Sequence, residues 1–259
     1  MPGKVYIVGA GPGAADLLTL RAASLLRAAG VILHDDLVPQ EILDLVAPAA
    51  EIINVGKRCG RHGASQEQIN ALMVQFARQP RSVVRLKSGD PAVFGRLGEE
   101  LDALRDAGVP FEIVPGVTAA TAAAAAANFT LTDRRAASAL VVLTAHNARK
   151  QSLAGVLFDP QQATYAIYMP GPDYGRTARE LVRLGLDAAT PCAVVSNAGR
   201  AQQQIKFLSL SELPSVTGVA APAVLVVGEV VSKSNFAEAA YFLEEIYESV
   251  RNSSQNPAY

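Results

Sequence analysis

The chain has 259 residues, of which 50% are apolar and 18% are charged, and its formal net charge is −1. This composition is typical of a globular protein with one large core or two smaller ones. The balanced charge excludes a general attraction to nucleic acid or to an anionic membrane surface. Cys59 and Cys192 lie far apart with no metal-site spacing. They favour a reduced, cytoplasmic protein, with a structural disulfide as the alternative.

Neither a signal segment nor a membrane span is expected. Residues 1–4 run directly into a predicted strand, without the apolar segment of a secretory signal. The longest uncharged stretch, 113–132, consists mostly of alanine and threonine and opens with Pro115 and Gly116. This stretch predicts a packed helix rather than a membrane span.

The first half of the chain alternates predicted strands and helices. Ser65 and Gln68 form a capping box before a helix with one apolar face. The alternation predicts a largely parallel sheet covered by helices. Strands are predicted at 5–8, 31–33, 83–86 and 111–114, with one more before Val55, and helices at about 19–30, 65–76 and 99–107.

The second half is more mixed. A boundary is predicted at 115–118, followed by an alanine-rich helix at 119–127. Segment 203–208 is typical of a hairpin strand. Further strands are predicted at 139–143, 164–168, 192–196 and 223–227, with a helix at 177–184. We therefore predict an α/β protein with two domains, 1–115 and 118–231, and a C-terminal segment, 232–259.

The C-terminal segment contains one more predicted helix. Residues 236–250 place apolar side chains on one stripe, and we expect that helix to pack on the second domain or on a dimer interface. The polar tail, 252–259, is expected to be disordered.

Residues 9–14, GAGPGA, fit the dinucleotide pattern G-x-G-x-x-G/A, with Asp35 and Asp36 near the position of a ribose-binding acid. In that motif the helix starts inside the glycine run, so that its N–H groups face a pyrophosphate. Here Pro12 removes one donor, and the helical pattern begins several residues later. We therefore favour a different ligand loop, with a plain turn and a nicotinamide-binding loop as alternatives.

Segment 85–100, RLKSGDPAVFGRLGEE, is the most informative part of the chain. It follows a predicted buried strand, at the edge of an α/β sheet where ligands bind. Gly89 and Gly95 permit a close approach to the backbone, while Asp90 and Arg96 supply opposite charges. The alternative is an ordinary connection between a strand and a helix.

Other polar loops also follow predicted strand ends. Acidic residues follow 31–33, basic residues lie at 57, 58 and 61 and at Arg134 and Arg135, and Met169 ends another strand. When each is taken alone, such charged groups are usually solvated surface charge, and such a methionine is usually part of the core. Because nearly all of these loops share the carboxyl ends of strands, we expect them to meet in one crevice.

Taken in order, these motifs resemble the tetrapyrrole methylase family, and most closely its uroporphyrinogen-III C-methyltransferases. The loop of 85–100 separates that subfamily from the related ribosomal-RNA and diphthine methyltransferases. The matching segments, which span 4–231, are VYIVGAGPG (5–13), VILHDDLV (31–38), VGKR (55–58), RLKSGDPAVFGRLGEE (85–100), VPGVTAA (114–120), LTDRR (131–135), LTAH (143–146), YMPG (168–171), TPCAVVSNAGRAQQQ (190–204) and PAVLVVGEVV (222–231).

The resemblance implies two α/β domains with S-adenosylmethionine (SAM) bound in the cleft between them, a homodimer, and no metal. Asp35 matches the family's proposed general base and Lys57 its proposed proton donor, and Arg96 is the third expected catalytic residue. Implied SAM contacts are Pro12, Ser88, Gly89, Asp90, Val93, Thr118, Ala119, Met169 and Ala198. Residues expected to line the tetrapyrrole trough are Arg96, Glu99, Arg134 and His146.

The implied activity is the transfer of two methyl groups from SAM to uroporphyrinogen III, which gives precorrin-2 for sirohaem or cobalamin synthesis and releases S-adenosylhomocysteine. Several positions depart from the family pattern. The family usually has glycine at Ser88, Leu97, Ala145, Pro170 and Ala198, an aromatic residue at Ala92, histidine at Asp133 and often arginine at Asp36. Two alternatives therefore stay open: methylation of another tetrapyrrole or corrin precursor, and a catalytically weakened paralogue that binds SAM or tetrapyrrole.

Overall fold

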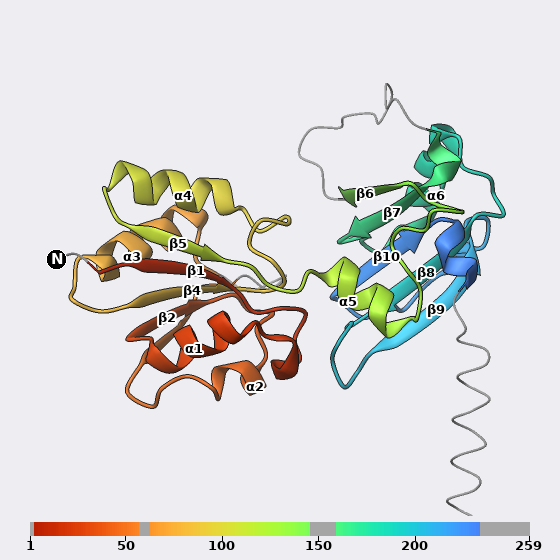
Figure 1. Ribbon diagram of the computed structural model, residues 1–259. Helices are drawn as coiled ribbons and strands as arrows, with labels where there is room; N and C mark the ends of the chain where they lie inside the picture. The colour runs from red at the N-terminus through yellow and green to blue at the C-terminus, as the bar shows by residue number, and fades with distance from the viewer. Residues whose placement is uncertain (1–2, 57–62, 146–158, 234–259) are drawn as a thin grey trace, which may run out of the picture. The chain divides into compact units, whose positions relative to one another are not determined.

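The structure is a computed structural model that describes residues 3–56, 63–145 and 159–233 (Figure 1). The residue contacts divide the chain into two compact units, 1–122 with 197–203, and 123–196 with 204–259. Several predictions lie outside the described residues: the basic positions 57, 58 and 61, including Lys57, and also Cys59, His146, the helix at 236–250 and the polar tail.

The described part of the first unit is built around a parallel sheet (Figure 1). Its strand order is β3 (Glu51–Asn54), β2 (Val31–His34), β4 (Val83–Lys87), β1 (Val5–Gly9) and β5 (Phe111–Val114). Every neighbouring pair is parallel, as the alternating pattern predicted. The helices are α1 (Leu20–Ala28), α2 (Gln40–Leu43), α3 (Gln66–Ala77) and α4 (Leu97–Asp106), with a 3-10 turn at Ala15–Leu17.

The helices cover both faces of this sheet. Leu26 of α1 and Ile42 of α2 pack with Leu86 on one face. Met73 of α3 and Leu104 of α4 pack with Val83 on the other face. Because side chains alternate along a strand, the odd-numbered residues of β4 point toward α3 and α4.

Local sequence signals explain where most of these helices begin. The Thr19 hydroxyl accepts the Ala22 N–H at 3.1 Å and caps α1. The predicted capping box of α3 is present, with Ser65 and Gln68 bonded reciprocally at 3.2 and 2.7 Å. Helix α4 starts at Leu97, two residues before the predicted start, because the preceding Arg96 adopts a left-handed conformation with φ of +53° and ends the loop there.

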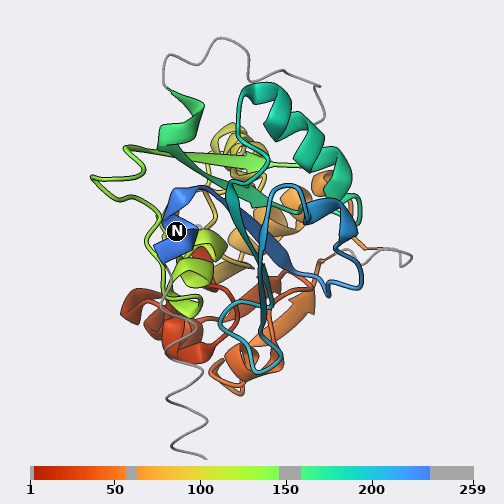
Figure 2. The same cartoon turned by 90° about the vertical axis from the view of Figure 1, so that its right-hand side faces the viewer.

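The second unit contains a mixed sheet, shown from another side in Figure 2. The strand order is β6 (Ala139–Thr144), β7 (Ala163–Tyr168), β10 (Ala223–Val227), β8 (Pro191–Ser196) and β9 (Gln204–Ser209). Strands β6 and β7 are parallel, and the other pairs are antiparallel. The segment predicted as a hairpin strand is β9, which pairs with β8. The two α/β units confirm the predicted fold class.

Helix α6 (Tyr174–Leu184) packs on one face of this mixed sheet through Ala178 and Leu181, against a core that includes Tyr165 and Leu225. It begins three residues before the predicted start because Asp173 caps it by accepting the Arg176 N–H at 2.8 Å. The other helical segments are α5 (Ala119–Ala126) and 3-10 turns at Pro160–Gln162, Leu213–Ser215 and Glu229–Lys233. Within the described ranges, no helix has the length and apolarity needed to cross a membrane.

Candidate active site

The loops that follow β1, β2, β4 and β5 meet at one edge of the parallel sheet, because parallel strands share their carboxyl ends. Two of these loops are joined directly by their backbones. Gly11 donates its N–H to Gly89 at 3.2 Å, and Gly89 donates back to Gly11 at 2.7 Å. This edge therefore brings together many of the predicted site residues of the first unit: Pro12, Asp35, Ser88, Gly89, Asp90, Val93 and Arg96.

Glycines at this edge allow three loops to pack backbone against backbone. A Cβ atom on Gly116 would lie 2.3 Å from the Gly89 carbonyl oxygen, and one on Gly9 would lie 2.6 Å from the Gly116 nitrogen. A Cβ on Gly89 would meet nothing within 4 Å, although its φ of +67° favours glycine. Gly9 and Gly116 thus serve loop packing, while Gly89 leaves backbone open on the side where a ligand is expected.

Asp90 holds its own loop against the end of β5. One carboxylate oxygen accepts the Ala92 N–H at 2.8 Å, and the other accepts the Gly116 N–H at 3.0 Å. Both bonds are charge-assisted and therefore stronger than bonds between neutral groups. Asp90, predicted as a SAM contact, also shapes the loop that carries Ser88 and Gly89.

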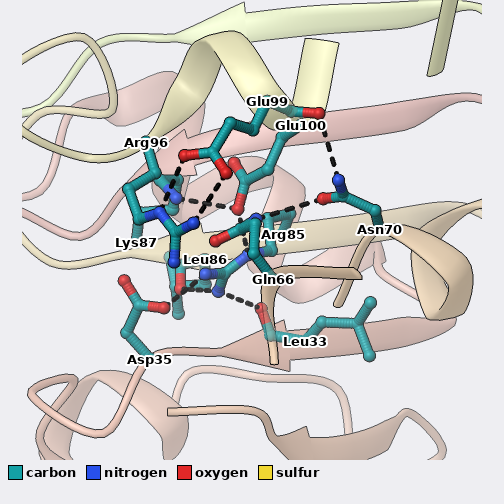
Figure 3. A network of polar contacts seen from close by, with 10 residues as sticks. All are labelled: Leu33, Asp35, Gln66, Asn70, Arg85, Leu86, Lys87, Arg96, Glu99 and Glu100. Carbon is teal, nitrogen blue, oxygen red and sulfur yellow. Dashed lines mark hydrogen bonds and ion pairs between the residues drawn. The ribbon is translucent and has the colours of Figure 1, made fainter. Parts of the chain in front are cut away.

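A buried network of charges lies beneath this edge and ends at Asp35 (Figure 3). Arg85 donates from Nη2 to Asp35 Oδ1 and from Nε to Glu100 Oε1, the latter at 2.9 Å. Lys87 donates to the same Glu100 oxygen at 2.8 Å. The side chains of Arg85 and Lys87 are 3% exposed, that of Glu100 is 0% exposed and that of Asp35 is 27% exposed. Two cations and two anions thus form one connected group.

Burial and the neighbouring acids act in opposite directions on the pKa of Lys87. Removal from water lowers the pKa of Lys87, and the nearby Arg85 lowers it further, while Glu100 and Asp35 oppose that shift. Removing one partner of such a buried pair typically costs about 3–5 kcal/mol, because it leaves a buried charge uncompensated. Sequence reasoning did not single out Arg85, Lys87 and Glu100 as site residues.

Arg96 and Glu99, both predicted to line the tetrapyrrole trough, contact each other. The Arg96 guanidinium donates to both Glu99 carboxylate oxygens, at 2.8 and 2.6 Å (Figure 3). This hydrogen bonding raises the pKa of Arg96 and lowers the pKa of Glu99. Both side chains are about half exposed, so a bound carboxylate can reach Arg96 in place of Glu99.

A loop between β8 and β9, residues 197–203, belongs to the first unit. Its Arg200 donates from Nε to the Pro12 carbonyl at 2.9 Å and from Nη2 to the Leu37 carbonyl at 2.8 Å. Arg200 therefore ties the glycine loop to the turn after Asp35, and burial lowers its pKa. The same loop carries Ala198, a predicted SAM contact, which is buried. Arg200 was not predicted as a site residue, although its segment lies within the family resemblance.

The remaining predicted site residues follow the first sheet or belong to the second unit. Thr118 precedes α5, and Ala119 is its first residue. Met169 follows β7 with φ of +50°, a strained conformation for a residue other than glycine. Arg134 lies in a turn where its neighbour Arg135 pairs with Asp133 at 2.9 Å. The structure does not test the roles predicted for any of these residues.

A parallel α/β unit with its polar loops at one sheet edge, followed by a mixed α/β unit, defines the class of protein. The chain belongs to the tetrapyrrole (corrin/porphyrin) methylases, whose family model matches residues 4–214. This finding confirms the predicted family resemblance.

Individual relatives make the similarity more specific. A uroporphyrinogen-III C-methyltransferase from Paracoccus denitrificans is 42% identical over 95% of this chain and 86% of its own length. A siroheme synthase from Cronobacter sakazakii is 45% identical over 88% of this chain but 49% of its own length, so the chain spans about half of that relative. A solved uroporphyrin-III C-methyltransferase from Thermus thermophilus, in complex with S-adenosylhomocysteine, is 37% identical with a TM-score of 0.72, covering 88% of this chain and 93% of that one.

Proposed function

We propose that the protein is a SAM-dependent C-methyltransferase that converts uroporphyrinogen III to precorrin-2 by two methyl transfers, for sirohaem or cobalamin synthesis. The observation that carries this proposal is the match to a uroporphyrinogen-III C-methyltransferase of similar length, aligned over nearly the whole chain. The solved relative with bound S-adenosylhomocysteine supports SAM as the methyl donor and S-adenosylhomocysteine as the product.

The loops at the sheet edge supply the groups that such a reaction needs. SAM brings a methyl group on a positively charged sulfur, and an electron-rich pyrrole carbon attacks that methyl group in line. Holding the two reactants in this alignment can supply roughly 7–11 kcal/mol of barrier reduction. The open backbone at Gly89 fits a SAM molecule lying against this loop. The proposed SAM contacts remain Pro12, Ser88, Gly89, Asp90, Val93, Thr118, Ala119, Met169 and Ala198.

Proton transfer is assigned to Asp35 and Lys57. After methyl transfer, the ring carries an additional positive charge and must lose a proton. A carboxylate at the carboxyl end of β2 stabilises that charge and can accept the proton. Asp35 has the required partial exposure, with a side chain that is 27% exposed. Lys57 keeps its proposed role as a proton donor.

Cationic side chains suit a substrate that carries eight carboxylates. Arg96, Arg134 and His146 are proposed to anchor these carboxylates, with Glu99 holding Arg96 in place before the substrate arrives. Each charge-assisted hydrogen bond contributes about 1.5–3 kcal/mol. We further propose that the protein is a cytoplasmic homodimer that uses no metal and binds neither nucleic acid nor membrane.

An anaerobic incubation of the purified protein with uroporphyrinogen III and SAM tests this function. Mass spectrometry is expected to show a product heavier by two methyl groups, formed together with S-adenosylhomocysteine. No mass gain with SAM still bound would contradict the substrate and favour another tetrapyrrole or corrin precursor. Loss of SAM binding in a folded protein would contradict the activity and favour a weakened paralogue.

A further inference from the structure

The guanidinium of Arg85 is fixed by more contacts than its two ion pairs. Its Nη1 donates to the carbonyl oxygens of Leu33 and Leu86, at 3.3 and 3.2 Å. These carbonyls belong to β2 and β4, so the guanidinium is anchored to two neighbouring strands. Nε and Nη2 then reach one carboxylate each, Glu100 and Asp35. The planar fork of an arginine suits this arrangement, whereas the single ammonium group of a lysine does not.

Among the described residues, Arg85 holds the Asp35 carboxylate through one of its two oxygens. Its Oδ1 accepts from Arg85, while Oδ2 receives no hydrogen bond from any residue in the part of the chain that the structure describes. The backbone of Asp35 is also fixed, because its N–H donates to Leu86 at 3.0 Å and its carbonyl oxygen lies 2.9 Å from His34 Nδ1. One oxygen is thus bound and the other is left to take a proton.

Glu100 and Lys87 determine how strongly Arg85 acts on Asp35. Glu100 competes with Asp35 for the positive charge of Arg85, and Lys87 offsets that competition by pairing with Glu100. Among the residues that the structure describes, the charged or titratable groups around Asp35 include Arg85, Lys87 and Glu100 in the network, and its sequence neighbours His34 and Asp36.

We propose that Arg85 is a positioning residue that orients the Asp35 carboxylate, so that Oδ2 accepts the proton lost from the methylated ring. The inference rests on the proposed function of Asp35. In the step concerned, the ring C–H bond breaks, its electron pair returns to the ring, and the proton forms a bond to Asp35 Oδ2.

Loss of the guanidinium is expected to lower the rate more than the binding of either ligand. In Arg85→Gln, the Asp35 carboxylate loses the group that orients it, so kcat falls while the KM for uroporphyrinogen III and the Kd for SAM stay near their wild-type values. General-base catalysis contributes roughly 10²–10⁴-fold to a rate, and we expect kcat to fall by at least about tenfold. Lys87→Met should lower kcat by less, because Arg85 still bonds Asp35 while Glu100 draws more strongly on Arg85.

A charge-retaining variant tests whether orientation, and not charge alone, is needed. Arg85→Lys keeps a positive charge but cannot bond Asp35, Glu100 and two carbonyls together. We expect kcat to fall while the affinity for SAM stays near its wild-type value. Thermal unfolding and SAM titration report whether each variant is folded. If Arg85→Gln does not fold, Arg85→Lys carries the test, and a wild-type kcat in that variant would overturn the proposal.

A double-mutant cycle with Asp35→Asn decides whether Arg85 acts through Asp35. The full-length protein is assayed with uroporphyrinogen III and SAM, and Arg105→Gln, an exposed arginine paired with Asp102, serves as the matched control. Arg85→Gln should cause little further loss in the Asp35→Asn background. An equal loss in both backgrounds would overturn the Arg85 inference and leave Asp35 as the base. A wild-type rate for Asp35→Asn would instead remove Asp35 from the chemistry, and the inference with it.

Discussion

Two adjacent glutamates at the start of α4 (Leu97–Asp106) lie in opposite environments. Glu99 is half exposed and binds Arg96, whereas Glu100 is fully buried and binds Arg85 and Lys87. Arg85 lies in the predicted buried strand, 83–86, and a buried cation needs an acid as a partner. The sequence does not indicate which nearby acid points inward, because that depends on where α4 begins. The prediction placed that start two residues too late.

Replacing Arg96 tests the substrate assignment at the level of a single side chain. Arg96→Ala should weaken tetrapyrrole binding by roughly 10- to 100-fold, since a charge-assisted hydrogen bond of about 1.5–3 kcal/mol is lost. SAM affinity should stay unchanged, as measured by calorimetric titration of each ligand. Arg105→Ala on the same helix is the control, because its exposed ion pair with Asp102 is not part of the site. Weaker SAM binding with intact tetrapyrrole binding would reverse the assignment of this loop.

The sequence predicted where the loops lie along the chain, but it did not predict how they pack against one another. Gly9 was interpreted as part of a ligand loop or turn and Gly116 as part of a domain boundary, and both proved to be required for contact between backbones. Such contacts join segments far apart in the chain, and local sequence carries no signal for them. Strand positions were predicted well because apolar runs are local. The short helix α2 was not predicted, because its four residues are too few to show a helical period.

A methyl group at Gly116 should disturb the packing of these loops. Its Cβ would lie 2.3 Å from the Gly89 carbonyl oxygen, so the loop after β4 must shift. Gly116→Ala is expected to lower the free energy of unfolding by about 1–3 kcal/mol and to weaken SAM binding, as measured by urea unfolding and by titration. Gly98→Ala is the matched control, since a Cβ there meets nothing within 4 Å. If Gly116→Ala bound SAM with wild-type affinity, the contact between these loops would not be needed for SAM binding.

At the scale of the whole molecule, the two units have separate cores and differ in sheet type. The mixed character of the second sheet followed from one hairpin signal, and the structure confirms it. The loop 197–203 groups with the first unit although both flanking strands lie in the second. Arg200 of this loop bonds the carbonyls of Pro12 and Leu37, and only the folded chain brings these residues together.

A buried thiol links the stability of the fold to alkaline pH. Burial raises the pKa of Cys192 from 9.0 to about 12. Between these values the unfolded chain loses the thiol proton while the folded chain keeps it, so the free energy of unfolding falls as pH rises. This contribution approaches about 1.4 kcal/mol per pH unit. Burial also raises the pKa of Tyr165 and of Tyr174, which adds a fall of the same sign.

Urea unfolding at about four pH values between 8 and 11 measures how steeply the free energy of unfolding falls with pH. Cys192→Ala should give a shallower fall than the wild type. Val194→Ala, a buried substitution on the same strand, should lower stability at every pH and leave the slope unchanged. Identical slopes in the wild type and Cys192→Ala would show that the thiol does not titrate differently in the two states.

The alternation of charged and apolar side chains along β4 also restricts how this central strand can align with its neighbours during folding. Sliding β4 by one residue would turn Arg85 and Lys87 toward Leu26 and Ile42, and would leave Glu100 facing Val84 and Leu86. A misaligned strand would therefore bury unpaired charge on both faces at once. A β4 strand made only of apolar residues would carry no such penalty. The charged side chains that hold Asp35 therefore also disfavour incorrect alignments of β4, the central strand of the sheet.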